Sequence, residues 1–417
     1  MRILLTGASG FIGSRLQTAL LGEGHELLCT ARKPGASGHP RLSFIEADFS
    51  KDTGKSAWTA RLRGIDAVIN CVGIFRESGR QTFAALHTDT PCALFAACAD
   101  AGHVQLVVQL SALGADSGAD TAYHRSKKAA DDFLASLPLR ACIVQPSLVY
   151  GRDGSSARAF RILASLPFGL RFGAAPQLVQ PIHVDDLVGA ICALVRQPAT
   201  GRIALVGPRA LSFTDYLAAL RRGMGMGRQP VLRLPGVLAR MVARLGFGLL
   251  DRDALRMLDR GSTADPAATA GLLGRAARPV EGFIDYPQAE RSQARLGWLL
   301  PVLRSALAAV WIATALVSFG LYPVQDSLAL LERTGVPPAW APLMLYGAAG
   351  VDLLIGLAIL LLRRRRWLWL AQLLLVGFYT IVVAWKLPEF LLHPYGPLTK
   401  NLPMLAAIWL LYELEEK

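Results

Sequence analysis

The first 150 residues alternate short apolar runs with longer amphipathic stretches. The apolar runs predict strands, at 3–5, 26–30, 42–45, 67–71, 105–110 and 140–145. The stretches between them predict helices, at 10–21, 82–101 and 122–136. Strands that alternate with helices of this length are typical of βαβ units. The pattern therefore predicts an α/β fold built on a doubly wound parallel sheet.

The composition changes abruptly after Pro301. Four apolar segments follow, at 305–325, 340–362, 367–385 and 397–414. The first three are long enough to cross about 30 Å of hydrocarbon at about 1.5 Å per residue. The fourth is marginal, because Lys400 and Asn401 lie near its start. We expect two domains, residues 1–300 and an all-α transmembrane four-helix bundle at 301–417.

The charges set the predicted orientation. Arg363 to Arg366 form a run of four between the second and third segments, and loops rich in arginine and lysine stay on the cytoplasmic side. We therefore expect a multi-pass protein of the inner (cytoplasmic) membrane with its N-terminal domain in the cytoplasm. The six cysteines form no CxxC pair and no cluster with metal-ligand spacing, so we expect neither disulfides nor a metal site.

Residues 151–300, the expected substrate lobe, hold much of the excess positive charge. The chain has a formal net charge of +13, and every basic residue in this region is an arginine. Anionic lipid attracts arginine near a membrane surface. Within 234–249, Arg240 and Arg244 lie four apart among apolar residues, a pattern typical of an interfacial helix and equally of a groove-lining surface helix. No recognised nucleic-acid-binding motif is present, so we expect a lipid bilayer and no nucleic acid as partner.

A glycine-rich turn follows the first predicted strand, with the pattern G-x-x-G-x-x-G. Such glycines permit a tight turn, a close approach of the backbone to a pyrophosphate, and close packing of the next helix on the strand. The helix N-terminus then faces the phosphates. The turn predicts a dinucleotide site in a Rossmann-type domain, and the residues expected at the cofactor are Thr6, Gly7, Ser9, Gly10, Phe11, Ile12 and Gly13.

Two basic residues follow the second predicted strand, where a cofactor with a free 2′-hydroxyl usually meets Asp or Glu. Arg32 and Lys33 would instead receive a 2′-phosphate, although an ordinary solvated basic turn is the alternative. We therefore expect NADP(H) in preference to NAD(H). Asp48, after the third strand, is expected to reach the adenine. The backbone wall beside the ribose is expected at Cys71, Val72 and Gly73.

A tyrosine and a lysine four residues apart provide candidate chemistry. Tyr123 and Lys127 share one face of a predicted helix, and the ammonium of Lys127 would lower the pKa of Tyr123 toward neutrality. The phenol could then serve as an acid or a base. We predict Tyr123 as proton donor, Lys127 as the residue that tunes it and binds the ribose, and Ser111, at a strand end, as the residue that orients a substrate carbonyl.

These motifs resemble the short-chain dehydrogenase/reductase superfamily, in its extended or atypical branch. Stretches 66–74, 111–115, 123–127, 145–151, 181–187 and 257–266 are similar to NAD-dependent epimerase/dehydratase-like proteins, in particular the bacterial relatives of the NADPH-binding complex I accessory subunit. The resemblance implies that Pro146, Ser147 and Leu148 lie beside the nicotinamide. Gln145 departs from the family pattern, which often has Arg before that proline. Residues 301–417 resemble the DoxX-like membrane domain, mainly through 393–403.

These features predict a membrane-tethered NADP(H)-binding oxidoreductase that transfers hydride to or from a carbonyl or alcohol. The alternatives are a non-catalytic NADPH-binding sensor or assembly factor and an epimerase or dehydratase of the same superfamily. An unpaired ionisable group inside a membrane costs at least about 2.5 kcal/mol. Asp352, in the second apolar segment, is therefore expected to pair with Lys400 or His393, or to fix the packing. A bundle that does more than anchor the chain predicts a lipophilic or quinone-type substrate.

Overall fold

The protein divides into two compact units, which are described one at a time. The computed structural model describes residues 1–172, 177–234, 252–362, 365–394 and 396–415. The units are Met1–Ala294 and Arg295–Lys417. Residues 235–251 lie outside the described residues. They include Arg240 and Arg244, so the predicted interfacial helix lies outside the described residues as well.

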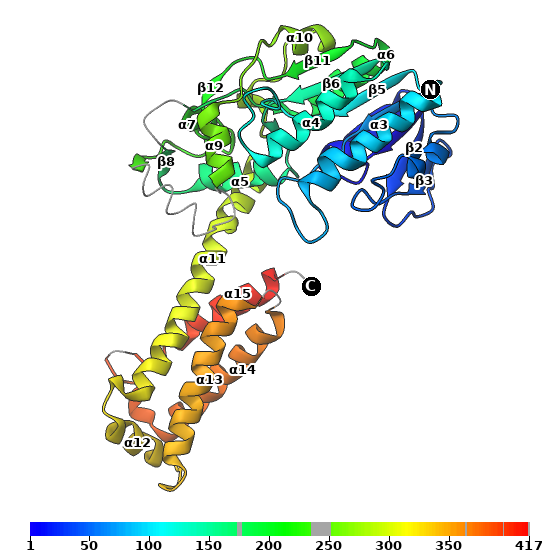
Figure 1. Ribbon diagram of the computed structural model, residues 1–417. Coiled ribbons are helices and arrows are strands. Elements are labelled where there is room, and N and C mark those ends of the chain that lie inside the picture. Colours follow the sequence, from blue (N-terminus) through cyan, green and yellow to red (C-terminus); the bar gives the residue numbers. More distant parts are fainter. Residues whose placement is uncertain (173–176, 235–251, 363–364, 395, 416–417) are drawn as a thin grey trace. The chain divides into compact units, whose positions relative to one another are not determined.

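Unit 1 is built on one seven-stranded parallel sheet (Figure 1), which confirms the predicted fold class. The strand order is β11-β6-β5-β4-β1-β2-β3. The strands are β1 (Arg2–Thr6), β2 (Glu26–Ala31), β3 (Leu42–Glu46), β4 (Ala67–Asn70), β5 (Leu106–Leu110), β6 (Ala141–Pro146) and β11 (Gly201–Leu205). The chain starts in the middle, runs outward to β3 and crosses back to β4. Ligands of such sheets bind where the strand order reverses, beyond the carboxyl ends of β1 and β4.

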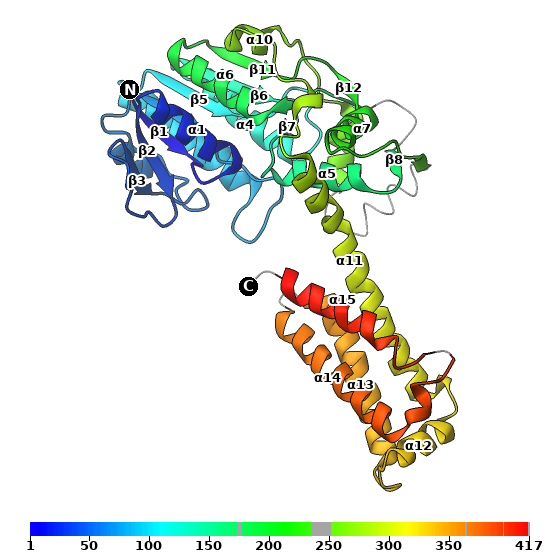
Figure 2. The ribbon, with the colours of Figure 1, turned by 180° about the vertical axis from the view of Figure 1, so that it is seen from behind.

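Helices cover both faces of this sheet (Figures 1 and 2). The helices on one face are α1 (Phe11–Gly22) and α6 (Val184–Arg196), and those on the other are α3 (Thr90–Ala101) and α4 (Ala122–Ser136). Successive strand side chains point to opposite faces. Ile3 and Leu5 therefore join the core under α1 and α6, while Leu4 joins the core under α3 and α4. Strands buried on both faces explain why the sequence shows continuous apolar runs here.

The rest of unit 1 consists of short elements, many of which surround a separate apolar core that includes Phe213 and Tyr216. Its two-stranded pairs are β7 (Val149–Tyr150) with β10 (Ile182–His183), β9 (Leu178–Val179) with β12 (Leu211–Ser212), and β8 (Gly169–Phe172) with β13 (Val231–Leu234). The helices are α5 (Ser155–Ser165), α7 (Phe213–Gly223), α9 (Arg252–Arg260) and α10 (Ala267–Leu273), while α2 (Ser56–Thr59) precedes β4.

Unit 2 is helical. Three of its helices are long and apolar enough to span a membrane: α11 (Pro287–Leu316) with its π-helical continuation to Leu321, α13 (Ala341–Leu361) and α14 (Arg366–Lys386). The short α12 (Val324–Arg333) precedes α13. The first predicted span, 305–325, is corrected at both ends, because its helix begins at Pro287 and ends at Leu321. α15 (Asn401–Leu414) has 14 residues, or about 21 Å at 1.5 Å per residue, which is shorter than the hydrocarbon core.

Several polar side chains inside unit 2 are paired, and the Asp352 carboxyl is not. Trp311 Nε1 donates to Gln372 Oε1 at 2.8 Å, and Asn401 Nδ2 donates to Thr380 Oγ1 at 2.8 Å. Asp352 is 6% exposed, and its Oδ1 has no hydrogen-bond partner among the described residues. The structure does not show the expected ion pair with Lys400, which is exposed.

Candidate active site

The glycine turn lies at the predicted point, beyond the carboxyl end of β1. Gly7 has a φ of +72°, and a Cβ there would lie 2.9 Å from the backbone carbon of Cys71. A Cβ at Gly13 would lie 2.1 Å from the Gly7 oxygen, so α1 packs against the turn more closely than any side chain allows. The turn is closed by Gly10 N–H, which donates to Gly7 O at 2.9 Å. This backbone fits a pyrophosphate at the N-terminus of α1.

The basic pair after β2 is free to meet a ligand. Arg32 and Lys33 are both exposed, and neither forms an ion pair within the part of the chain that the structure describes. Asp48 is already engaged: its carboxylate accepts from Ser50 N–H at 3.0 Å and from Ser50 Oγ at 2.7 Å. These bonds, with the Lys51 ammonium 3.5 Å away, keep the pKa of Asp48 below its ordinary value. Its role at the adenine stays a prediction.

A polar ladder crosses the carboxyl ends of three neighbouring strands. Thr6 Oγ1 donates to Asn70 Oδ1 at 2.5 Å, and Asn70 Nδ2 donates to Gln109 Oε1 at 2.7 Å. All three side chains are fully buried. The ladder fixes the start of the segment Cys71–Gly73 beside the glycine turn, since Val72 N–H also donates to Asn70 Oδ1, at 3.3 Å. Burial raises the pKa of the Cys71 thiol to about 12, so the thiol is protonated at neutral pH, and the place of Cys71 beside the ribose stays a prediction.

The predicted tyrosine and lysine lie on one face of α4. Lys127 is 4% exposed, and its Nζ donates to Leu110 O at 3.0 Å and to Val72 O at 3.4 Å. The ammonium therefore bridges the ends of β4 and β5. Tyr123 is 9% exposed, with the ring of Phe75 stacked on it at 5.3 Å. Among the described residues the Tyr123 hydroxyl makes no hydrogen bond, which leaves it available to a substrate.

The pKa values at this site differ from the prediction. Burial raises the pKa of Tyr123 above its ordinary value, and the charge of Asp131 raises it further. Burial lowers the pKa of Lys127 to about 8. The expected lowering of the tyrosine pKa by Lys127 is therefore wrong, because burial and the Asp131 carboxylate both act in the opposite direction. At neutral pH the phenol is therefore protonated, the form that carries a proton to donate.

Ser111 is engaged away from the tyrosine. Its Oγ donates to Asp131 Oδ2, and among the described residues it forms no hydrogen bond with the Tyr123 hydroxyl. A role in orienting the substrate stays a prediction. Pro146, Ser147 and Leu148 lie where β6 ends, and the Ser147 hydroxyl donates to Gln180 O at 2.5 Å. The backbone of this segment is thereby fixed, and its place beside the nicotinamide also stays a prediction.

Sequence reasoning missed two buried polar residues next to these groups. Asp131 follows Lys127 by four residues, so helical spacing was a usable signal. Burial raises its pKa to about 6, and its Oδ1 has no partner among the described residues. His87 lies in a π-helical turn, Ala84–Asp89, and its ring meets the edge of the Tyr123 ring at 5.5 Å. No local pattern marks His87, since its contacts are with residues distant in sequence.

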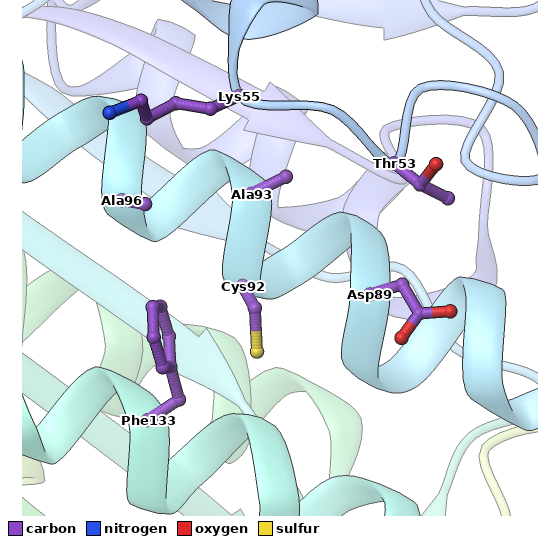
Figure 3. Close-up of a pocket in the computed structure, with 7 residues that line it drawn as sticks. All are labelled: Thr53, Lys55, Asp89, Cys92, Ala93, Ala96 and Phe133. Carbon is purple, nitrogen blue, oxygen red and sulfur yellow. The ribbon is translucent and has the colours of Figure 1, made fainter.

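A surface pocket lies apart from this cluster. Figure 3 shows Cys92 of α3 pointing toward the side of Phe133 of α4, and the lining also includes Thr53, Lys55, Asp89, Ala93 and Ala96. Lys55 is paired with Asp100, and the predicted site residues are not part of this lining. We assign the pocket no role. In the described part of the chain no group of three or more His, Cys, Asp or Glu could hold a metal.

Two family models match the chain. Residues 3–207 match the NAD dependent epimerase/dehydratase family, and residues 308–409 match the DoxX-like family. An uncharacterized protein of Mycobacterium tuberculosis is 30% identical over 262 residues, which cover 61% of this chain but 27% of that protein. This chain therefore corresponds to about a quarter of that relative's length.

For two further relatives, the alignment with this chain covers more of the relative's own length. An epimerase family protein of Mycobacterium bovis is 28% identical over 293 residues, covering 64% of this chain and 90% of the relative. A ceramide reductase of Caulobacter vibrioides is 28% identical over 239 residues, covering 56% of this chain and 73% of the relative. Both alignments span most of the relative and more than half of this chain.

Solved structures share the fold of unit 1. The UDP-glucuronic acid 4-epimerase of Bacillus cereus, in complex with UDP-glucuronic acid and NAD, is 19% identical with a TM-score of 0.51, covering 72% of this chain and 100% of that one. A nucleoside-diphosphate-sugar epimerase of Staphylococcus aureus is 16% identical with a TM-score of 0.56, covering 69% and 100%. At these identities the likeness shows the fold alone.

Proposed function

Since the chain joins an NAD-dependent epimerase/dehydratase domain (residues 3–207) to a C-terminal DoxX-like domain (residues 308–409), we propose that it is a membrane-tethered NADP(H)-dependent oxidoreductase. The reaction is hydride transfer to or from a carbonyl or alcohol. The bound dinucleotide would supply the hydride chemistry, and every other task falls to residues of the chain.

One observation carries this proposal: Lys127 reaches the ends of both β4 and β5, one helical turn from a Tyr123 hydroxyl that has no bond within the described protein. The glycine turn beyond β1 would hold the pyrophosphate, and the segment Cys71–Gly73 would line the ribose. Tyr123 then donates a proton to the carbonyl oxygen, while Lys127 holds the ribose and favours the phenolate that remains. Arg32 and Lys33 would select a 2′-phosphate.

We further propose a lipophilic substrate that enters from the bilayer of the inner membrane, with unit 1 in the cytoplasm. The support is the presence of three candidate membrane spans where one would anchor the chain. A relative is a ceramide reductase, a name that joins reduction to a lipid. Asp352 is buried in α13, and its Oδ1 has no partner among the described residues; this supports a bundle that does more than anchor, since ionisable residues within membranes mark functional sites. Quinone-type carbonyls fit the same chemistry.

The test is turnover by the full chain in lipid nanodiscs, followed as NADPH oxidation with long-chain carbonyl and quinone substrates. Tyr123→Phe should lower kcat at least about a hundredfold, the range of a general acid, while NADPH affinity stays within about threefold. Tyr286→Phe is the matched control, because Tyr286 is 59% exposed and belongs to no part of the site. Unchanged turnover in the Tyr123 variant would disprove the mechanism.

An epimerase or dehydratase of the same family is the second candidate, favoured by the fold shared with sugar-nucleotide epimerases. Such an enzyme regenerates its cofactor in each cycle, so a sugar nucleotide would be converted without net NADPH consumption. A sensor that binds NADPH would show neither activity. The nanodisc assay separates the three candidates when conversion of an added sugar nucleotide is followed beside NADPH oxidation.

A further inference from the structure

A buried histidine ties the two halves of the proposed site together. His87 is fully buried, and both of its ring nitrogens are occupied. Nε2 accepts from the Ile74 N–H at 3.0 Å, and Nδ1 lies 2.9 Å from Ser126 Oγ. Since a backbone N–H can only donate, Nε2 carries no proton, and the neutral ring holds its proton on Nδ1. Burial keeps the ring neutral by lowering its pKa to about 2.

Each bond reaches a different part of the site. Ile74 directly follows the segment expected to line the ribose, Cys71–Gly73. On the other side, the Ser126 hydroxyl donates to the backbone oxygen of Tyr123 at 2.8 Å, in the first turn of α4. His87 thus connects the loop after β4 to the helical turn that carries the phenol.

Gly73 shows how tightly this connection is built. A Cβ added to Gly73 would lie 3.1 Å from Lys127 Nζ and 3.5 Å from His87 Nε2. Two hydrogen bonds therefore hold the loop within three residues. Lys127 Nζ donates to Val72 O, and His87 Nε2 accepts from Ile74 N–H. Releasing one of these bonds frees the loop while leaving the Tyr123–Lys127 pair on its helix.

We propose that His87 is a positioning residue, which fixes the loop after β4 against Tyr123 and Lys127 and thereby sets how the site holds the ribose of a dinucleotide. This inference rests on the part of the proposed function that says the site binds a dinucleotide. It does not depend on which reaction the protein catalyses. His87 touches no reacting atom and acts through Ile74 and Ser126. The bond that matters is the one to Ile74, because this is the bond that reaches the loop.

Two substitutions separate the two bonds. The carbonyl oxygen of a glutamine reaches about as far as Nε2, while an asparagine reaches only about as far as Nδ1. His87→Gln can still accept from Ile74 N–H, but His87→Asn cannot. The full chain in nanodiscs is titrated with NADPH and with NADH. The affinity of His87→Asn for each dinucleotide should be about tenfold weaker than that of the wild type, a factor expected for one lost hydrogen bond. His87→Gln should stay within about threefold of the wild type.

Amide hydrogen exchange in the peptide covering residues 71–75 provides a second readout. Exchange should speed up in His87→Asn and remain slow in His87→Gln. His124→Asn is the control, because the His124 ring lies 5.3 Å from the Tyr123 ring but is not bonded to the loop. That variant should bind NADPH within about twofold of the wild type.

Three outcomes would overturn the inference. Equal affinity for dinucleotide in all variants would show that the loop does not depend on His87. Equal losses in His87→Gln and His87→Asn, in step with their unfolding temperatures, would reduce His87 to a core residue. A wild-type chain that binds neither NADPH nor NADH would overturn both this inference and the proposed function. The expected binding pattern without turnover would support His87 and contradict only the reaction.

Discussion

Burial of ionisable side chains governs the site at the scale of single residues. Tyr123, Lys127 and Asp131 lie along one face of α4, and each is less than a tenth exposed. Desolvation disfavours the charged form of each group. Burial moves the pKa of Asp131 up to about 6 and that of Lys127 down to about 8, so both titrate near neutral pH.

Replacing Asp131 should move the pH dependence of turnover. The Asp131 charge raises the pKa of Lys127 against the effect of burial, so Asp131→Asn should lower it further. Lys127 would then lose its ammonium at lower pH, and the alkaline limb of kcat/KM should shift downward by roughly one unit, the size of shift a nearby charge produces. An alkaline limb that stays in place would contradict the coupling. Asp132→Asn, on the exposed side of the same helix, is the control.

The same substitution should also change stability. A carboxyl whose pKa is higher in the folded than in the unfolded chain binds more protons when folded, so stability falls as pH rises from about 4 through 6. Asp131→Asn lacks this loss, and its amide oxygen can still accept from Ser111. Above pH 6 the variant should be more stable by about 1–2 kcal/mol, allowing for relaxation, and the gain should vanish below pH 4. Thermal unfolding in nanodiscs at pH 4 and pH 7 measures it.

We propose that the basic pair after β2, Arg32 and Lys33, decides the choice of cofactor. Arg32→Asp combined with Lys33→Ala should weaken the binding of NADPH at least about tenfold and the binding of NADH less than about threefold. Only NADPH has a 2′-phosphate that loses a charge-assisted hydrogen-bond partner. Arg63→Asp is a control of the same kind, an exposed arginine that precedes the amino end of β4. Equal losses for both cofactors in isothermal titration would show that the pair does not contact the 2′ position.

At the scale of elements, the contact between α1 and the glycine turn leaves no room for a methyl group. Gly13→Ala should push α1 away from the turn, since its Cβ would lie 2.1 Å from the Gly7 oxygen. We expect dinucleotide binding to be lost and the protein to be destabilised by roughly 3 kcal/mol or more, the scale of severe steric defects. Gly22→Ala, on the same helix with nothing within 4 Å of its Cβ, should be neutral or slightly stabilising. Similar dinucleotide affinity in the two variants would contradict the role of this contact.

The elements that could be predicted are those with a strong local pattern. The six predicted strands of the sheet and the turn at Gly7 are confirmed, because buried parallel strands give continuous apolar runs. β11 was missed because Gly201–Leu205 begins with an exposed glycine and an exposed arginine and has only three apolar residues. The start of α11 was missed because its first turns are polar. The hydrogen bonds of Ser111 and His87 could not be predicted, because their partners are distant in sequence. Asp131 lies 20 residues after Ser111. Ser126 lies 39 residues after His87, and Ile74 lies 13 residues before it.

At the scale of the whole molecule, the boundary between the units lies inside a helix. Glu290, in the first turn of α11, is buried within unit 1. Its Oε2 accepts from Arg161 Nη1 and from the Tyr150 hydroxyl, both at 3.0 Å. Arg161 is 3% exposed, so loss of Glu290 leaves a buried guanidinium without its carboxylate, at a cost of about 3–5 kcal/mol.

Two truncations should therefore behave differently. A fragment of residues 1–300 keeps Glu290 and should fold and bind NADPH, whereas a fragment of residues 1–286 should aggregate or melt at a much lower temperature. Full-length Glu290→Gln isolates the charge and should be destabilised in the same direction. Equal unfolding temperatures of the two fragments would contradict this assignment. If the substrate enters from the bilayer, the 1–300 fragment should turn over short-chain carbonyls but not long-chain ones.

The position of Glu290 also bears on how the protein is made. A nascent chain folds from its N-terminus as it leaves the ribosome, and unit 1 lacks its last buried carboxylate until residue 290 has emerged. The next helical turns of the same α-helix belong to the first candidate membrane span among the described residues, which a membrane insertion machinery could recognise. Completion of the catalytic unit and recognition of the chain for insertion thus fall in the same short interval of synthesis. A chain that is not inserted into the membrane at that moment has a folded dinucleotide-binding unit joined to an apolar helix that is exposed to water instead of lipid.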